Sequence, residues 1–251
     1  IRKGHGPIYI DCRHLNEKDL THLMATLGYD KDTLPDYFKQ RGEDLGTRPV
    51  EINVSEGMQA GPTEGTGSGI KIDKNSAATV AGLFACGDAC DHNRCVHGAV
   101  AGGYKAGKSA VAFAQTFQHG YQAPGSMTRE QIDRFMEPLH RSSGYPYRQV
   151  EDTIRKIMAE HVGPRRTEHA LTRGLEKLRR VEHYLDEIRA DDLHELMRTH
   201  ETRSILAVGK LMATTALFRK ESRNKPYHHR LDFPDSDDTN WCGLVVVRKE
   251  G

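Results

Sequence analysis

The sequence predicts an α/β part followed by an all-α part. A short apolar run, Gly82–Cys86, stops at Gly87-Asp88, which is typical of a buried strand that ends in a tight turn. From Tyr104 the pattern becomes helical, with small and apolar residues recurring at three- and four-residue intervals. After residue 126 only helical periodicities remain, and they predict an antiparallel helical bundle domain followed by an irregular polar tail.

Two short strands and two helices are expected at the start of the chain. Residues 7–11 and 50–54 have strand patterns. Asn16 and Asp19 are expected to cap an amphipathic helix that ends at Gly28, and a second helix is expected to begin near Thr33 and to end before Gly46. The side chains that these helices should bury are Leu20, Leu23, Met24, Leu27, Tyr37 and Phe38.

A glycine-rich run, Glu56–Gly69, cannot be the interior of a helix or a strand and predicts a loop. Ile70–Asp73 then alternates as a strand would. From the residues alone, the loop is either a turn that faces a ligand or a surface linker.

Four helices should build the bundle after a linker that includes Gly120, Pro124 and Gly125. The first is capped by Ser126 or Thr128 and carries Ile132, Phe135 and Met136. The second stops at Gly163-Pro164, and its apolar residues are Val150, Ile154, Ile157 and Met158. The third has its apolar repeat at Leu171, Leu175, Leu178, Val181, Leu185 and Ile188, and the fourth spans about residues 191–220. We expect the outward charges, such as Arg165-Arg166 and Arg179-Arg180, to be solvated surface. In the tail we expect Arg219, Arg223 and Arg230 to pair with acidic residues, Trp241 to anchor the packing, and residues 244–247 to add a strand or to dock on a partner.

Composition excludes some classes of protein. Lys and Arg (36) almost balance Asp and Glu (35), so no basic excess indicates nucleic-acid binding. No apolar run reaches the roughly 18 residues of a membrane span. Five cysteines, an odd number without a secretory signal, favour a reducing compartment, and we expect a cytoplasmic protein that is either free or peripheral to a membrane complex.

Three cysteines lie close together and raise the alternative of a metal or iron–sulfur site. Cys86, Cys90 and Cys95 have the spacing C-x3-C-x4-C, with His92 and His97 nearby. Ferredoxin-type clusters use C-x2-C spacing, and structural zinc sites usually add a second pair far downstream. We therefore favour buried thiols over a metal site.

Three stretches carry a resemblance to one family. The first resembles the second FAD-binding segment of the flavoprotein subunits of succinate dehydrogenase, fumarate reductase, L-aspartate oxidase and adenylylsulfate reductase. It consists of GLFACGDA (82–89), HGA (97–99) and GG (102–103), with the glycine pair opening a helix. IRKGHGPIYIDCRHL (1–15) resembles the family's segment G-x-G-P-v-y-l-D-x-R-h-L. RKESR (219–223) with DFPDSDDTNW (232–241) resembles its carboxyl-terminal signature.

The resemblance implies a fold and a domain order. Residues 1–46 would end a capping domain that closes over substrate, 47–119 would form the carboxyl-terminal part of a two-dinucleotide-binding-type FAD domain, 120–225 the helical bundle domain, and 226–251 a tail that packs on the flavin domain or a partner. The G-x-G-x-x-G fingerprint of such domains does not occur in these 251 residues. We therefore expect a fragment or a separately built piece, completed by the amino-terminal half of the flavoprotein.

The resemblance also implies the cofactor, FAD, and its site. The residues expected to hold FAD are Gly87, Asp88, Ala89, His97, Gly98, Gly102, Gly103, Tyr104 and Lys105, with the backbone N–H groups behind the glycine pair at a helix start. The residues expected to take part in catalysis are Glu64, Thr66 and His97. Lys105 would lie near the pyrimidine edge of the flavin, although a solvent-facing lysine is an equal alternative; for His97 the alternatives are ring packing and acid/base chemistry.

Two positions depart from the dicarboxylate-binding pattern of the family. Glu64 stands where the family has a histidine, and Ala101 stands where it has an arginine that clamps a carboxylate. The resemblance therefore implies an FAD-dependent oxidoreductase for a different small substrate, organic or a sulfur oxyanion, which passes electrons to an iron–sulfur partner. The alternative is a non-catalytic polypeptide that carries flavin in an electron-transfer or assembly role.

Overall fold

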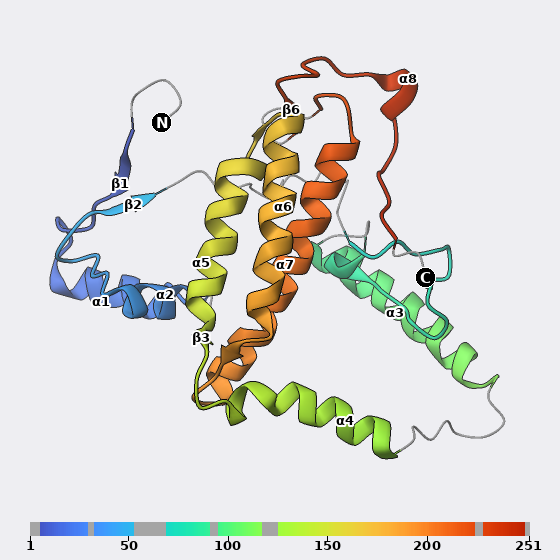
Figure 1. The fold of residues 1–251 in the computed structure, drawn as a ribbon, viewed down its shortest axis with the longest axis horizontal. Coiled ribbons are helices and arrows are strands. Elements are labelled where there is room, and N and C mark those ends of the chain that lie inside the picture. Colours follow the sequence, from blue (N-terminus) through green and yellow to red (C-terminus); the bar gives the residue numbers. More distant parts are fainter. Residues whose placement is uncertain are drawn as a thin grey trace. The chain divides into compact units, whose positions relative to one another are not determined.

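The structure is a computed structural model, and it describes residues 6–29, 33–52, 69–90, 95–116, 125–223 and 228–248. Its contacts divide the chain into two compact units, Ile1–Ser55 and Glu56–Gly251. Figure 1 shows the elements of both, and each unit is described by itself. In the described ranges, no helix has the length and apolar character needed to cross a bilayer.

The first unit is a strand pair with two helices. β1 (Ile8–Ile10) pairs antiparallel with β2 (Val50–Ile52), and α1 (Glu17–Thr26) and α2 (Thr33–Arg41) lie between them in the sequence. Asn16 caps α1, because its Oδ1 accepts the backbone N–H of Asp19 at 2.9 Å. These elements are confirmed.

A small core holds this unit together. Cys12, Phe38 and Leu45 are buried, and the leucines of α1 pack against them. The expectations that Met24 and Tyr37 are buried were wrong, because these residues are 37% and 42% exposed, whereas Phe38, next to Tyr37, is buried. Adjacent helical residues lie 100° apart, so a helix with one buried face does not bury both.

Between residues 69 and 116, the part that the structure describes (69–90 and 95–116) contains one 3-10 turn, η1 (Gly87–Ala89), and one long helix, α3 (Cys95–Ala114). The strands expected at 70–73 and 82–86 were wrong, because each is reduced to one isolated bridge, Ile70 with Cys90 and Ala77 with Phe84. A strand needs a hydrogen-bonded neighbour along its length, and the described residues provide only these bridges.

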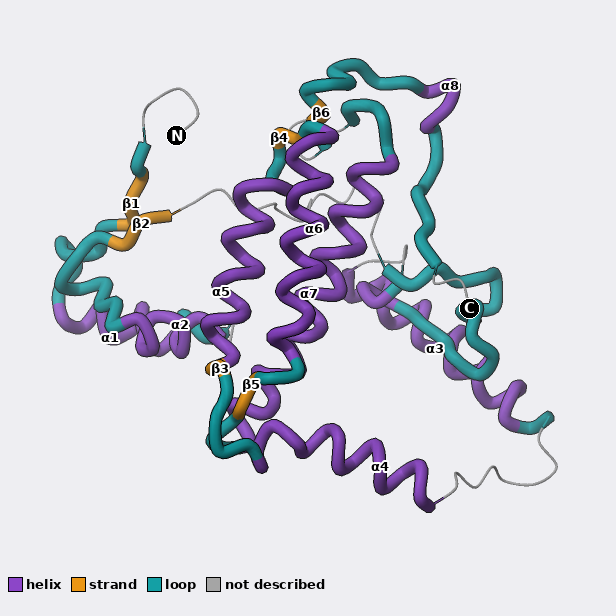
Figure 2. The backbone as a smooth tube through the Cα atoms, viewed as in Figure 1, coloured by secondary structure: helices purple, strands orange, loops and turns teal. Residues whose placement is uncertain are grey.

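The rest of the chain is a three-helix bundle with short connecting elements (Figures 1 and 2). In order it contains α4 (Gly125–Met136), η2 (Glu137–His140), β3 (Tyr145–Pro146), α5 (Tyr147–Ile157), the π-helical turn η3 (Met158–Val162), β4 (Arg165–Arg166), α6 (Glu168–Leu185), β5 (Ile188–Arg189), α7 (Leu193–Phe218), β6 (His229–Arg230) and α8 (Asp238–Trp241). α5, α6 and α7 alternate in direction (Figure 1), which confirms the antiparallel bundle. The expectation that a fourth helix belongs to it was wrong, because α4 has no buried residue and its Ile132 and Phe135 are 56% and 51% exposed.

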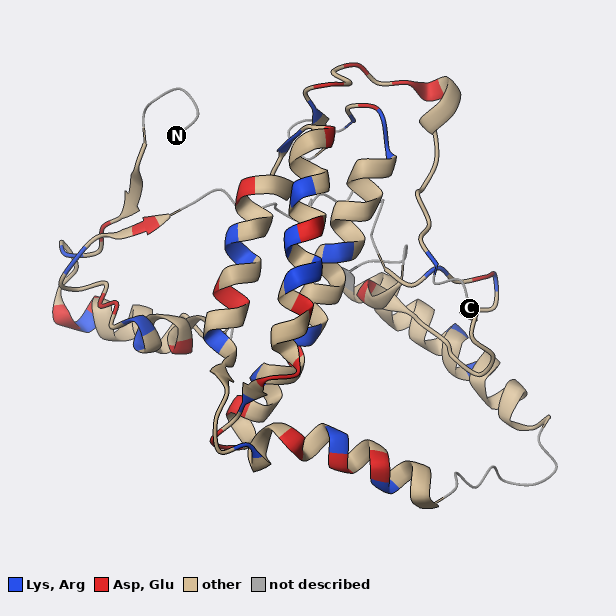
Figure 3. Ribbon diagram, in the orientation of Figure 1, with Lys and Arg blue, Asp and Glu red and all other residues tan. Residues whose placement is uncertain are grey.

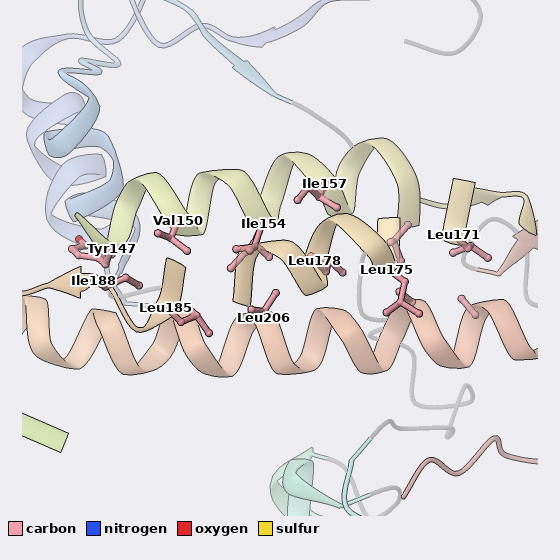
Figure 4. Close-up of a cluster of buried hydrophobic side chains, with 14 residues drawn as sticks. Tyr147, Val150, Ile154, Ile157, Leu171, Leu175, Leu178, Leu185, Ile188 and Leu206 are labelled. Atoms are coloured by element: carbon pink, nitrogen blue, oxygen red, sulfur yellow. The ribbon is translucent and has the colours of Figure 1, made fainter. Parts of the chain in front are cut away.

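The apolar side chains of α5, α6 and α7 meet along the bundle axis (Figure 4). Most of the predicted core is confirmed. Two details were wrong: Ile188 is buried in β5 rather than in the helix, and α4 begins at Gly125, before the expected cap. The core members are Tyr147, Val150, Ile154, Ile157, Val162, Leu171, Leu175, Leu178, Val181, Leu185, Ile188, Leu206, Ala213 and Ala216.

Two buried arginines cap helix ends at one end of the bundle. Arg166, 5% exposed, donates through Nε to the carbonyls of Val162 and Gly163, each at 3.1 Å, where η3 ends. Arg230, fully buried, donates through Nη1 to the carbonyls of Ala216 at 2.9 Å and Leu217 at 3.2 Å, in the last turn of α7. Cations stabilise the negative ends of helix dipoles. The expectation that Arg166 is solvated was therefore wrong.

The tail is tied to the same end of the bundle by ion pairs. Glu221 is fully buried between Arg219 and Arg223, and Arg223 also reaches Asp238 at 2.7 Å. The rings of Trp241 and Phe218 pack almost perpendicular to each other, with centroids 5.4 Å apart. The expected arginine–acid pairing is confirmed. Trp241 contacts α7 of the bundle, and packing of the tail on the flavin domain or a partner stays a prediction. Residues 244–248 have no regular secondary structure, so the strand is absent there.

Candidate functional site

The end of the glycine-rich loop lies directly on η1. The Ile70 backbone N–H donates to the Ala89 carbonyl at 2.9 Å. A Cβ at Gly69 would lie 2.5 Å from the carbonyl oxygen of Cys90, so only glycine fits this approach of two backbones. Two stretches that the sequence assigned to one site are therefore in contact.

η1 in turn packs on the first half of α3. Gly87 has φ +60°, and a Cβ there would lie 3.1 Å from the Cβ of Ala99. A Cβ at Gly103 would lie 3.9 Å from the Sγ of Cys86. The loop end, η1 and α3 thus converge around Gly87.

The glycine pair does not open the helix. α3 begins at Cys95, so Gly102 and Gly103 lie in its interior, where backbone N–H groups bond to carbonyls one turn earlier. The expected amide-lined helix entrance behind Gly103 was therefore wrong. Each glycine lowers the stability of a helix by only about 1 kcal/mol relative to alanine, and the neighbouring alanines favour the helix. The free N–H groups belong to the first turn, which contains His97 and Gly98.

The predicted flavin-contacting residues divide into buried glycines and exposed side chains. Those buried are Gly87, Gly98 and Gly102, with Gly103 half-buried; those exposed are Asp88, Ala89, His97, Tyr104 and Lys105. The structure thus brings Gly87, Asp88 and Ala89 against α3. Glu64 and Thr66 lie outside the described residues.

Lys105 lies on a different side of α3 from Gly103. The two residues are two positions apart, so their side chains are rotated by about 200° from each other around the helix axis. The backbone N–H groups of Ala77 and Asn75 lower the pKa of Asp73 below its ordinary value, and the Lys105 ammonium contributes to this shift. The Asp73 loop therefore faces Lys105, a neighbour that the sequence analysis missed because 32 residues separate the two.

α3 also carries an exposed apolar stripe. Val96 is 80% exposed, Val100 69%, Tyr104 72% and Val111 58%, at helical spacing along one side. Gly103 and Gly107 lie beside them and line a shallow open groove with Tyr104 and Lys108. Such a face is typical of a helix that is covered in the complete protein.

The described side chains contain no group of three or more His, Cys, Asp or Glu residues placed to hold a metal ion. Cys90 is fully buried, and its thiol donates to the Gly87 carbonyl at 3.1 Å. The side chain of Cys95 lies outside the described part, so the metal alternative remains a prediction.

Comparison with known proteins identifies the relatives. Residues 151–251 match the family model "Fumarate reductase flavoprotein C-term". An FAD-dependent oxidoreductase of Methanocaldococcus jannaschii is 26% identical over 260 residues, covering 98% of this chain and 44% of the relative. The fumarate reductase flavoprotein subunit of Escherichia coli is 28% identical over 262 residues, covering 97% of this chain and 41% of the relative.

Solved structures show the same fold. Adenylylsulfate reductase from Archaeoglobus fulgidus matches with a TM-score of 0.63 at 22% identity, covering 96% of this chain and 45% of that one. E. coli quinol fumarate reductase matches with a TM-score of 0.63 at 25% identity, covering 96% and 43%. The chain spans less than half the length of these relatives. Residues 151–251 thus match the fumarate reductase flavoprotein C-terminal model, and the chain along nearly its whole length is similar to fumarate reductase and L-aspartate oxidase flavoproteins.

Proposed function

We propose that the chain is part of an FAD-dependent oxidoreductase and that residues 69–116 form part of its flavin site. The observation that carries this proposal is the convergence of Gly69, η1 and the first half of α3 in a chain that is similar to flavoproteins. Bound FAD would supply the hydride chemistry.

The residues around this convergence suit an FAD molecule. Asp88 is exposed on η1 and offers a carboxylate that can accept hydrogen bonds from the hydroxyls of a sugar-alcohol chain. The first turn of α3, with His97 and Gly98, offers backbone N–H groups to an electron-rich edge. Gly87, Ala89, Gly102, Gly103 and Tyr104 complete the proposed cofactor contacts. Lys105, which faces the Asp73 loop from another side of α3, is better explained as a surface lysine.

Glu64, Thr66 and His97 are the proposed substrate-side residues. A carboxylate at position 64 can hold a cation or accept a proton, and Thr66 can donate a hydrogen bond. His97 is exposed in the first turn of α3, so it is accessible from outside this segment. With Ala101 in place of an arginine, the proposed substrate is a small organic molecule or sulfur oxyanion other than a dicarboxylate.

The exposed stripe of α3 supports a role for the amino-terminal half of the flavoprotein as its cover. Val96, Val100 and Tyr104 would be costly to leave in water, at about 25 cal/mol per Å² of apolar surface. The relatives have more than half of their length outside the matched region. We propose the domains 1–46, 47–119, 120–225 and 226–251 for this chain, with 47–119 completed by that half.

Electrons would leave through an iron–sulfur partner. The matched relatives include fumarate reductase flavoproteins and a component of a CoM/CoB fumarate reductase, which are named as subunits and are therefore parts of assemblies. A second candidate function is that of a flavin carrier without its own substrate, which the departures at Glu64 and Ala101 favour.

The flavin proposal is tested by cofactor content. In the full-length protein, Asp88→Ala should reduce the bound FAD per polypeptide, while Asp133→Ala on α4, also exposed, should leave it unchanged. The same flavin content in both variants would reject Asp88 as a cofactor contact.

The choice between the two functions is tested by turnover. The photoreduced holoprotein is mixed with fumarate, adenylylsulfate or oxygen, and flavin reoxidation is followed by its visible absorbance. Reoxidation by one of these acceptors supports the enzyme. Reoxidation by none of them, with rapid exchange with a ferredoxin-like protein, supports the electron carrier.

A further inference from the structure

One outward side of α6 carries a row of cations. Arg173, Lys177, Arg180 and Tyr184 follow one another at i, i+4, i+7 and i+11, so they share one side of the helix. The opposite side holds the buried leucines of the bundle core. Figure 3 shows Lys and Arg recurring along α6. We call these four residues the α6 cationic stripe.

Within the described ranges, the arginines of this stripe have no acidic partner. Neither Arg173 nor Arg180 forms an ion pair with a described residue, and Glu176 beside them forms none there either. Lys177 lies 3.8 Å from Glu160, whose side chain is 63% exposed, so this pair is weak. Eight other arginines between residues 137 and 230 do form ion pairs: Arg141, Arg155, Arg189, Arg198, Arg203, Arg219, Arg223 and Arg230.

Tyr184 gives the stripe a fixed aromatic end. Its side chain is 45% exposed, and its ring stands perpendicular to that of Tyr145, with centroids 5.3 Å apart. A held ring loses little conformational freedom on binding, and Tyr and Arg are the residues most often important at the centre of protein interfaces.

We propose that the α6 cationic stripe docks an acidic segment of a partner protein. Arg173 and Arg180 are seven helical residues apart, so the complementary carboxylates would be spaced by about 10 Å. A lipid surface fits less well, because Tyr184 is the single apolar group on the stripe and membrane-bound helices insert a broad apolar face. Nucleic acid fits less well, because Glu176 lies beside the arginines and the chain carries a net charge of only +1.

The test uses a fluorescein-labelled peptide of alternating Glu-Glu-Ala repeats and the full-length protein. The native protein should bind the peptide more weakly as salt rises from about 0.02 M to about 0.15 M. The double variant Arg173→Ala/Arg180→Ala should weaken binding about tenfold at low salt, since each exposed ion pair contributes roughly threefold. Circular dichroism checks that the variants keep their helices.

A matched control separates position from net charge. Arg129→Ala/Arg134→Ala removes two exposed arginines from α4 and should leave binding unchanged. Equal losses in both double variants would overturn the proposal, because net charge alone would explain them. The protein is also tested against vesicles rich in phosphatidylserine and against polyuridine. The proposal would be overturned if either bound more tightly than the peptide and this binding were lost in Arg173→Ala/Arg180→Ala.

Discussion

Replacing Glu221 with glutamine should destabilise the bundle by about 3 kcal/mol. The carboxylate is fully buried and accepts hydrogen bonds from Arg223 Nε at 2.7 Å, from the Asp237 backbone N–H at 2.8 Å and from Arg219. Removing one partner of a buried ion pair costs roughly 3–5 kcal/mol. The lower end applies because Arg223 keeps Asp238 at 2.7 Å. The midpoint of thermal unfolding should fall by roughly 10 °C.

The assay is urea unfolding followed by circular dichroism, at several pH values. Burial opposes the charge of Glu221, but the hydrogen bonds from Arg223, Asp237 and Arg219 outweigh it and lower its pKa to about 2. Its contribution is therefore fully present above the unfolded value of 4.5 and is lost as pH falls toward about 2. The native protein and Glu221→Gln should differ most at neutral pH and converge in acid.

Glu182→Gln is the matched control, because Glu182 also pairs with a cation, Lys210 at 2.7 Å, but is 55% exposed. It should cost at most about 1 kcal/mol. If Glu221→Gln costs no more than this control at neutral pH, the reasoning about the buried pair is refuted.

Three further changes test other contacts. Gly69→Ala would place a Cβ 2.5 Å from the Cys90 carbonyl oxygen, so it should detach the loop from η1. If the flavin proposal holds, the variant should also bind less FAD per polypeptide; an unchanged FAD content would argue against this contact as part of the site. Gly174→Ala would place a Cβ 2.7 Å from the Cβ of His161 and should cost about 1–3 kcal/mol in urea unfolding, whereas Gly107→Ala, with open space around it, should not destabilise the chain. Burial, and secondly the positive charge of Arg166, lower the pKa of His228 from 6.5 to about 4. The free energy of unfolding should therefore fall as the pH drops from 6.5 to about 4. His228→Asn should reduce this fall, and an unchanged pH profile in the variant would contradict the prediction.

Periodicity predicted the helices because their signals are local. Asn16 with Asp19 fixes the start of α1, and the leucine spacing of α6 fixes both the helix and its buried side. The strands at 70–73 and 82–86 were wrong because pairing depends on a neighbour that local pattern does not supply.

The same limit applies to the candidate site. The sequence assigned residues 87–89 and 97–99 to one cofactor site through their motifs, and the structure brings Gly87 against Ala99. It could not predict that Gly102 and Gly103 lie inside a helix, because a glycine pair is compatible with both a helix start and a helix interior flanked by alanines.

The contacts around the carboxyl-terminal signature stabilise the ends of the bundle helices. Arg230 caps the end of α7 and binds Asp232 at 2.8 Å, and Asp232 accepts the backbone N–H of Glu168 at 2.7 Å, where α6 begins. A cation thus meets the negative end of one helix dipole and an anion meets the positive end of the next. Arg166 caps the end of η3 in the same way, and within the signature Arg219, Glu221, Arg223, Asp232 and Asp238 form ion pairs inside the described structure. These ion pairs stabilise the bundle, so flavin content, and not bundle stability, is the measurement that tests the proposed function.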